Sequence, residues 1–544
     1  MKRVIILSFL FAASQQIFGQ KNEGGFNLER PKLVVGIMLD QMRLDYFYRY
    51  YDSYKPNGGF RRLLSEGFSC ENAIIPYAQT VTAVGHSSVY TGSVPAFTGI
   101  IANEWYSKEK GRTVYCAEDN GVKILGGTDS SKPMSPKNLW TTTMTDELRL
   151  ATNFKSKVIG VAIKDRASIL PSGHTANAAY WYDDLSGNWI SSTYYMDKLP
   201  DWVKKFNDRK LVDSFYRIGW NTLAPITQYT QSTSDNKSYE GKYNDDATVT
   251  FPHKFTAMIG KDYKAIRATP YGNTLTLMIA KKILEEENLG NRGVTDFLNL
   301  SLSSTDVIGH MYGPNSIEVE DVYRRVDIEL GQFLDELDKR VGKGNYLLFL
   351  TADHAATQAP GFLKENKLPG NAITSPTKEL NAAIREKFGI ADAVINTYAY
   401  QVYLNDPALS NAKIKKSKVA DFIIDYLNAK DEVYLAYNTE DINELNLPTE
   451  IKERFLKGFN PKLSGDIQII MKPGHLYGSE TGTNHGLWYP YDSHIPLMFY
   501  GWKVKPGQLN REVYMTDIAA TITSMLHIQM PSGCIGKPIF EVWK

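Results

Sequence analysis

The sequence has few cysteines and almost no net charge. Three of its 544 residues are cysteine, which excludes a disulfide scaffold. Lysine and arginine number 61 against 60 aspartates and glutamates, and a formal charge of +1 argues against a protein that binds nucleic acid or anionic membranes. Hydrophobic residues make up 43% of the chain, enough for a large core and too many for a disordered protein. Cys70, Cys116 and Cys534 leave open one disulfide with a free thiol, or no disulfide.

The apolar run at residues 4–13 is too short to cross a bilayer, which takes about 20 residues. It follows Lys2 and Arg3 and precedes polar residues and the small Gly19, which is the pattern of a secretory signal. A buried first strand is the alternative, but the basic start favours a signal. We therefore predict a signal peptide over residues 1–20 and a periplasmic or secreted product. No cysteine lies near the expected cleavage point, so we expect no lipid anchor, and we expect a monomer.

Short apolar runs that end near polar or charged residues recur along the chain. They alternate with stretches of helical spacing, such as 274–289 and 316–339. This alternation predicts an α/β fold: a three-layer arrangement with a mostly parallel central sheet and helices on both faces. Ligands bind at the carboxyl ends of the strands in such sheets. The predicted strands cover residues 32–40, 157–163, 297–302, 346–350 and 495–500.

Two stretches interrupt the alternation within the predicted catalytic domain, residues 21–544. Residues 180–255 are rich in Tyr, Trp, Ser, Asn and Gly, and we predict an inserted cap there. Residues 370–463 mix helical and short strand patterns and predict a further elaboration.

Carboxylates and histidines gather at the ends of the predicted strands. Asp306 and His310 stand four residues apart, so a helix would place both on one face. Each feature alone has an ordinary explanation, such as a surface contact or a helix cap. Together, three aspartates and three histidines in separate loops are what two Zn²⁺ ions require. The six residues are Asp40, Asp306, His310, Asp353, His354 and His485.

Residues 80–92 place small and hydroxyl residues ahead of a predicted helix. A helix start offers backbone N–H groups and positive potential, which suit phosphate binding. On local sequence alone, a threonine there is an ordinary N-cap.

With these motifs, the chain resembles the alkaline phosphatase superfamily, in the branch shared with nucleotide pyrophosphatase/phosphodiesterases. Within that branch it resembles more closely the PafA-type, phosphate-irrepressible alkaline phosphatases, from Val34 through a last predicted helix at residues 516–526. The resemblance implies that Thr82, four residues before His86, is the nucleophile and a metal ligand, and that Asn103 contacts phosphate. It implies one zinc on Asp306, His310 and His485 and another on Asp40, Asp353 and His354. His86 and His494 are expected to be structural.

The same resemblance assigns Lys164 and Arg166, in the segment Ile163-Lys164-Asp165-Arg166, to the phosphoryl oxygens. On sequence alone this segment is equally well an exposed basic helix start. With two zinc ions and three aspartates, these cations give the site three positive charges, which match a phosphate monoester dianion facing a threonine alkoxide. A diester carries one charge fewer and needs an apolar slot for its second substituent.

We therefore predict an exported zinc phosphatase that hydrolyses small phosphate monoesters through a phosphothreonine, with a broad range of leaving groups. A phosphodiesterase or nucleotide pyrophosphatase on the same site is the alternative, and a non-catalytic binding protein is the alternative from another class. A sulfatase lacks support because residues 82–86 carry no Cys or Ser in the setting that its modified nucleophile needs. A phosphomutase does not suit an exported chain, because its phosphosugar substrates are intracellular.

Overall fold

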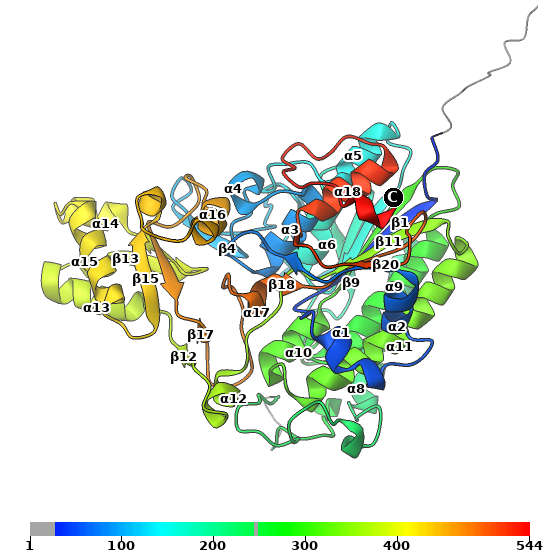
Figure 1. Ribbon diagram of the computed structural model, residues 1–544, viewed down its shortest axis with the longest axis horizontal. Helices are drawn as coiled ribbons and strands as arrows, with labels where there is room; N and C mark the ends of the chain where they lie inside the picture. The colour runs from blue at the N-terminus through cyan, green and yellow to red at the C-terminus, as the bar shows by residue number, and fades with distance from the viewer. Residues whose placement is uncertain (1–27, 244–247) are drawn as a thin grey trace, which may run out of the picture.

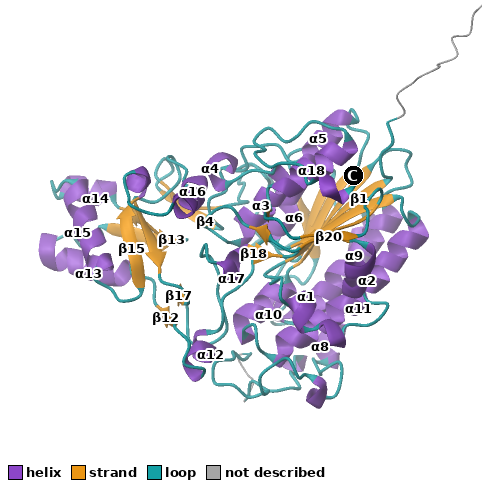
Figure 2. Cartoon of the chain, in the orientation of Figure 1, coloured by secondary structure: helices purple, strands orange, loops and turns teal. Residues whose placement is uncertain are grey.

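The computed structural model describes residues 28–243 and 248–544, so the predicted signal peptide lies outside the described residues. A ten-stranded sheet with helices on both sides forms the larger part of the molecule (Figures 1 and 2). Its strand order is β20-β2-β19-β11-β1-β10-β7-β8-β9-β6. The strands nearest its two sides include β20 (Gly507–Leu509), β2 (Phe68–Cys70) and β6 (Ile124–Leu125). This arrangement confirms the predicted three-layer α/β fold.

Five parallel strands make the centre of this sheet, and all of their residues are buried. Their residues are mostly apolar because both faces of the sheet are covered. The neighbouring β19 (Leu497–Gly501) runs antiparallel to β11, so the sheet is mixed toward its edges. The central strands are β11 (Tyr346–Thr351), β1 (Leu33–Leu39), β10 (Asp296–Leu302), β7 (Val158–Ala162) and β8 (Ala178–Tyr182).

Helices pack on both faces of the sheet (Figure 1). One layer holds α3 (Thr82–Thr91), α5 (Met144–Ala151), α6 (Asp165–Ser172) and α18 (Asp517–Leu526). The other holds α2 (Gly59–Glu66), α9 (Tyr271–Glu286), α10 (Ser304–Tyr312) and α11 (Ile317–Arg340).

Residues at both ends of the long helix α11 explain where it begins and ends. The side chain of Ser316 accepts a hydrogen bond from Val319 N at its start, and Lys339 and Arg340 stand in its last turn.

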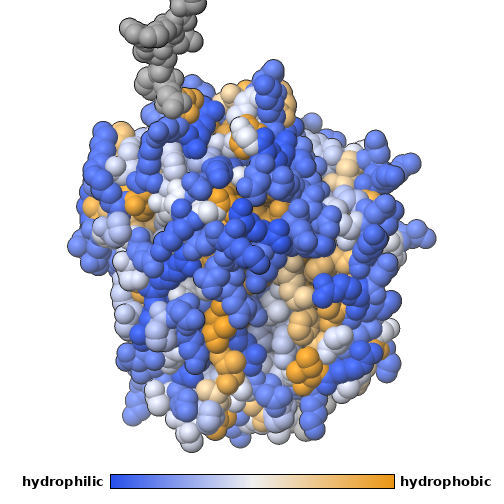
Figure 3. All heavy atoms as spheres, turned by 90° about the vertical axis from the view of Figure 1, so that its right-hand side faces the viewer, coloured by the Kyte–Doolittle hydropathy of each residue, from blue (hydrophilic) through white to orange (hydrophobic). Residues whose placement is uncertain are grey.

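Figure 3 shows the side of the molecule that faces away from the smaller sheet. Its surface is largely hydrophilic, with separate apolar patches.

A smaller unit lies to the left in Figure 1 and has its own apolar core. Its sheet has the order β13-β14-β16-β15, and helices α13, α14 and α15 pack with it. The predicted elaboration at 370–463 covers most of this unit, but β16 lies beyond it. The bounds are β13 (Val394–Tyr398), β14 (Gln401–Leu404), β15 (Val433–Asn438), β16 (Ile467–Met471), α13 (Thr377–Phe388), α14 (Asp406–Asn411) and α15 (Lys416–Asn428).

The segment predicted as a cap, residues 180–255, begins inside β8 and contains β9 (Trp189–Ser192). Both strands belong to the central sheet, so the first part of this segment is core rather than cap. Two short helices follow, α7 (Asp201–Asn207) and α8 (Leu211–Ile218). Whether the remainder covers the site stays a prediction.

All three cysteines are free thiols, which settles the pairing that the sequence left open. Among the described residues, no helix has the length and apolar character to traverse a bilayer.

Candidate active site

The candidate residues follow four central strands and lie together at the carboxyl ends of those strands. Asp40 follows β1, Lys164 follows β7, and Asp353 and His354 follow β11, while β10 leads into helix α10. Because these strands are parallel, their carboxyl ends meet at the same edge.

Helix α10 brings the first group of predicted metal ligands together. Asp306 lies in its first turn and His310 one turn later on the same face, with 3.1 Å between Asp306 Oδ1 and His310 Nε2. His485 comes from a distant loop, and its Nε2 lies 3.2 Å from His310 Nε2 and 3.6 Å from Asp306 Oδ1.

Asp40, Asp353 and His354 form the second group, and all three are fully buried. His354 Nε2 lies 3.6 Å from Asp40 Oδ1 and 3.4 Å from Asp353 Oδ2. The ring of His354 also stacks on that of His485, with 3.5 Å between centroids. His354 is within reach of Asp306 and His485 as well, so it faces both groups.

The three histidines are oriented alike. Nδ1 of His310, His354 and His485 makes a hydrogen bond to the carbonyl of Thr483, Ala355 and Thr80, at 2.8, 3.0 and 2.7 Å. These bonds leave Nε2 of each ring directed toward the group of carboxylates. This is the arrangement of metal-binding histidines, whose second nitrogen is held by an outer partner. Burial lowers the pKa of His354 and His485, which favours the neutral, ligating form.

The carboxylates also fit a metal. Both oxygens of Asp40 and Oδ2 of Asp353 are buried and accept no well-aligned hydrogen bond within the described chain, although the ammonium of Lys164 lies 2.6 Å from Asp40 Oδ2. Burial and the nearby Asp353 raise the pKa of Asp40 well above its usual range. Burial would also raise the pKa of Asp306, but His310 and Lys164 outweigh it and hold that pKa well below the usual range. A buried oxygen that accepts no hydrogen bond, as Asp40 Oδ1 is here, is costly unless a cation satisfies it.

Thr82 is the first residue of α3, and its side chain does not cap the helix. The N-cap position belongs to Val81. The Thr82 hydroxyl faces the two groups instead: Oγ1 lies 3.4 Å from His354 Nε2 and 3.4 Å from Lys164 Nζ, and the residue is 1% exposed. The helix start therefore presents a buried hydroxyl to candidate metal ligands rather than an N-cap.

The three predicted oxygen-binding residues are placed differently. Lys164 Nζ lies 2.6 Å from both Asp40 Oδ2 and Asp306 Oδ2, between the two groups. Asn103 Oδ1 accepts a 2.9 Å hydrogen bond from Ala83 N, in the first turn of α3. Arg166, in the first turn of α6, donates from Nη1 to the hydroxyl of Tyr115 at 3.1 Å.

The two histidines expected to be structural lie behind or away from this edge. His86 is fully buried, with Nδ1 2.9 Å from the carbonyl of Thr82 and 3.3 Å from Asp353 Oδ2. His494 Nε2 hydrogen-bonds the carbonyl of Glu71 at 2.8 Å.

Two residues at the site have no role in the sequence prediction. Gln41 donates to Asp306 and Asp353, and Tyr115 contacts Arg166. The only sequence signal for Gln41 is its position directly after Asp40. Tyr115 carries no such signal, because its partner lies 51 residues away.

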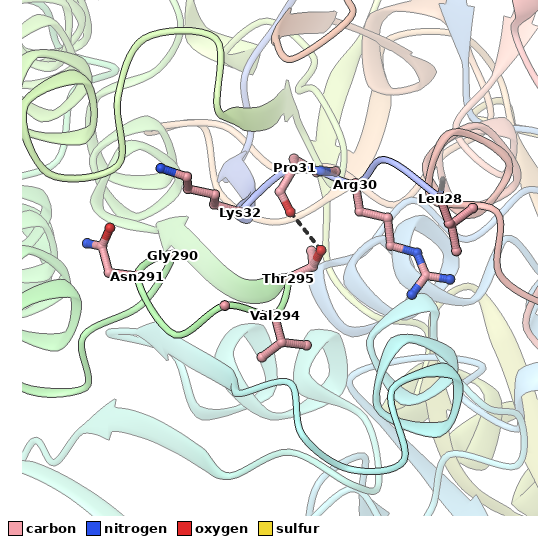
Figure 4. A pocket seen from close by; sticks show the side chains of 9 residues that line it. Leu28, Arg30, Pro31, Lys32, Gly290, Asn291, Val294 and Thr295 are labelled. Atoms are coloured by element: carbon pink, nitrogen blue, oxygen red, sulfur yellow. Dashed lines mark hydrogen bonds between the residues drawn. The ribbon is translucent and has the colours of Figure 1, made fainter. Parts of the chain in front are cut away.

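A hollow of about 500 Å³ lies at the other end of the central strands, where their amino ends begin (Figure 4). Lys32 and Thr295, which precede β1 and β10, line it, and Thr295 Oγ1 donates to the carbonyl of Pro31 at 2.6 Å. None of the candidate site residues lines it. The candidate chemistry belongs to the carboxyl ends of the strands, not to this hollow.

Comparison with protein families finds that the type I phosphodiesterase/nucleotide pyrophosphatase model matches residues 34–492. This range includes every candidate site residue.

Curated proteins resemble the chain over nearly its whole length. Alkaline phosphatase PhoV from Synechococcus elongatus is 51% identical over 518 residues, covering 95% of this chain and 93% of that protein. Alkaline phosphatase PafA from Elizabethkingia meningoseptica is 49% identical over 520 residues, covering 94% of each. A crystal structure of wild-type alkaline phosphatase PafA superposes with a TM-score of 0.93 at 48% identity, covering 95% of this chain and 99% of that one.

Proposed function

This chain belongs to the type I phosphodiesterase/nucleotide pyrophosphatase family and, within the alkaline phosphatase superfamily, to the PafA-type enzymes, and we propose that it hydrolyses phosphate monoesters through a phosphothreonine. The observation that carries this proposal is the position of Thr82. Its hydroxyl lies at a helix start, 3.4 Å from both an imidazole nitrogen and an ammonium group.

Six side chains are the proposed ligands of two zinc ions. Mixed carboxylate and imidazole ligands suit zinc, and the buried Asp40 Oδ1, which accepts no hydrogen bond in the described chain, supports a cation there. Bound zinc would lower the pKa of the threonine hydroxyl and stabilise charge on the leaving oxygen. One set is Asp40, Asp353 and His354, joined by Thr82 Oγ1, and the other is Asp306, His310 and His485.

The residues of the chain then have separate tasks. Thr82 Oγ attacks phosphorus, so an O–P bond to the enzyme forms while the bond to the leaving alcohol breaks. Water next cleaves the phosphothreonine, which releases phosphate and restores the hydroxyl. Asn103, Lys164 and Arg166 bind the non-bridging oxygens and stabilise their charge through fixed donors. The helix start at Thr82 adds backbone N–H groups and positive potential.

Charge supports monoesters over diesters. Lys164 and Arg166 add two cations to a site whose aspartates leave part of the zinc charge uncompensated. A monoester dianion uses that excess better than a diester, which has one charge fewer and a second substituent to place beside cations.

Replacement of the nucleophile tests the proposal. We expect Thr82→Ala to keep its bound metal and to lose monoester turnover by at least about a thousandfold. Thr82→Ser, which keeps a hydroxyl, is the matched control and should retain most of the activity and form a phosphoserine detectable by mass spectrometry after acid quench. Near wild-type turnover by metal-loaded Thr82→Ala overturns the assignment.

A phosphodiesterase or nucleotide pyrophosphatase on the same site is the second candidate, because the family model carries that description. Comparing kcat/KM for an aryl phosphate and a bis-aryl phosphate decides between them: a higher value for the monoester supports our proposal, and a higher value for the diester supports the alternative.

We also propose that residues 1–20 are removed on export and that the enzyme is monomeric. N-terminal sequencing and light scattering of the mature protein test these two points.

A further inference from the structure

The hydroxyl of Tyr115 joins two residues at the start of α6. Arg166 donates from Nη1 to the oxygen of this hydroxyl at 3.1 Å, and the hydroxyl itself donates to Asp165 Oδ1. The same carboxylate oxygen accepts the backbone N–H of Arg166. The tyrosine hydroxyl therefore fixes one nitrogen of the guanidinium to an anchored carboxylate.

The other N–H groups of the Arg166 guanidinium can donate to a bound ligand. Its Nε is buried and has no hydrogen-bond partner in the described part of the chain. A buried donor without a partner is costly, and arginine presents its N–H groups as a rigid fork that matches two oxygens of one phosphoryl group. With Nη1 held by Tyr115, the edge formed by Nε and Nη2 is the one left to receive such a ligand.

The same hairpin that carries Tyr115 also holds Asn103. Strands β4 (Glu104–Ser107) and β5 (Arg112–Tyr115) pair antiparallel, and Glu104 stands opposite Tyr115. The backbone N–H of Cys116 donates to the carbonyl of Asn103 at 3.0 Å. Asn103 in turn accepts from Ala83 N, next to Thr82. One hairpin thus links Arg166 to the loop that places Asn103 at the start of α3.

We propose that Tyr115 is a positioning residue that presents Arg166 to the phosphoryl group as a two-donor fork and thereby strengthens the preference for monoesters. This inference rests on the proposed function. A monoester dianion has three non-bridging oxygens and a diester has two, so a misplaced arginine weakens binding of the monoester transition state more.

The first test is Tyr115→Phe in the metal-loaded enzyme. We expect kcat/KM for an aryl phosphate to fall about ten- to a hundredfold, the loss of one charge-assisted hydrogen bond, while kcat/KM for a diester changes less than about threefold. Metal content and Tm should stay at the wild-type values. The matched control is Tyr106→Phe on β4, a half-buried tyrosine of the same hairpin that stands opposite Thr113 rather than beside a candidate site residue. Equal losses on both substrates contradict the proposal.

A double-mutant cycle separates positioning from a general structural effect. In an Arg166→Ala background, Tyr115→Phe should have no further effect on monoester hydrolysis. Independent, multiplicative losses overturn the inference. Asp165→Asn is the second variant should Tyr115→Phe fold poorly: it removes the carboxylate that anchors the hydroxyl, and its loss should also vanish in the Arg166→Ala background.

The cycle also separates a failure of the positioning role of Tyr115 from a failure of the proposed function. If Arg166→Ala weakens monoester hydrolysis but Tyr115→Phe does not, the positioning role is wrong and the proposed function stands. If Arg166→Ala has no effect on monoester hydrolysis, the assignment of Arg166 in the proposed function is wrong, and the role of Tyr115 is wrong with it.

Discussion

The side-chain amide of Gln41 donates a 2.7 Å hydrogen bond to Asp306 Oδ1, and the backbone N–H of Gln41 donates to Asp353 Oδ1 at 3.2 Å. One residue thus contacts a carboxylate from each group of candidate metal ligands. Its φ is +66°, in the left-handed region that side chains other than glycine rarely adopt. Such strain is found where the surrounding structure enforces it, often at functional sites.

We expect Gln41→Leu to bind zinc about ten- to a hundredfold more weakly, because outer partners orient the ligating carboxylates. Competition with a chromogenic chelator measures this directly, without relying on turnover. Gln41→Gly relieves the backbone strain and also removes the amide, so an equal loss in both variants assigns the effect to the side chain. Unchanged zinc affinity in Gln41→Leu would show that this hydrogen bond does not orient Asp306.

Gly309 in α10 is predicted to be required by Gln41. A Cβ at position 309 would lie 2.0 Å from Gln41 Oε1, so the buried Gln41 amide would have to move and would lose its hydrogen bond to Asp306. In a helix interior, alanine is normally more stable than glycine by about 1 kcal/mol. A glycine-to-alanine substitution in α10 would therefore ordinarily raise the stability of the protein. We expect Gly309→Ala to lower both Tm and zinc affinity instead. Adding Gln41→Gly to this variant removes the clash and should recover Tm; failure to recover would place the conflict elsewhere.

Lys164 is predicted to stabilise the metal-free folded protein more than the zinc-loaded one. Its ammonium lies between Asp40 and Asp306, where it balances two buried carboxylates. Breaking a buried ion pair by removing one partner costs about 3–5 kcal/mol. We therefore expect Lys164→Met to lower Tm strongly in EDTA and much less with excess zinc, because bound metal also stabilises the folded state. The same drop in both conditions contradicts this prediction.

Glu329 on α11 is predicted to make stability depend on pH. Burial raises its pKa to about 7, against an ordinary 4.5, although Thr274 donates to it at 2.6 Å. The folded protein therefore keeps a proton that the unfolded chain has lost, so stability falls as pH rises from about 4.5 to 7 and is level above. Glu329→Gln should be more stable than wild type at pH 8, by at most about 3 kcal/mol, and equally stable at pH 4. Urea unfolding at both pH values measures this; a constant difference between the two proteins contradicts it.

Much of the fold follows from local sequence. The apolar runs at 32–40 and 346–350 become buried central strands because only a sheet covered on both faces accepts continuous hydrophobic residues. The spacing of Asp306 and His310 places them on one helix face without any reference to the rest of the chain. The sequence did not indicate that β8 and β9 join the central sheet, because their aromatic and polar composition resembles that of an exposed insert.

By itself, the sequence determined which residue types stand at the ends of which strands, since hydrophobic period and helix spacing are local properties. Only the tertiary structure decided their partners. The order β11-β1-β10-β7 brings Asp353, Asp40, Asp306 and Lys164 to one edge, although they are far apart in the chain. The contacts of Gln41 with Asp306 and of Tyr115 with Arg166 likewise span 265 and 51 residues. Hydrogen bonds over such separations depend on how strands pair and helices pack, which no local pattern encodes.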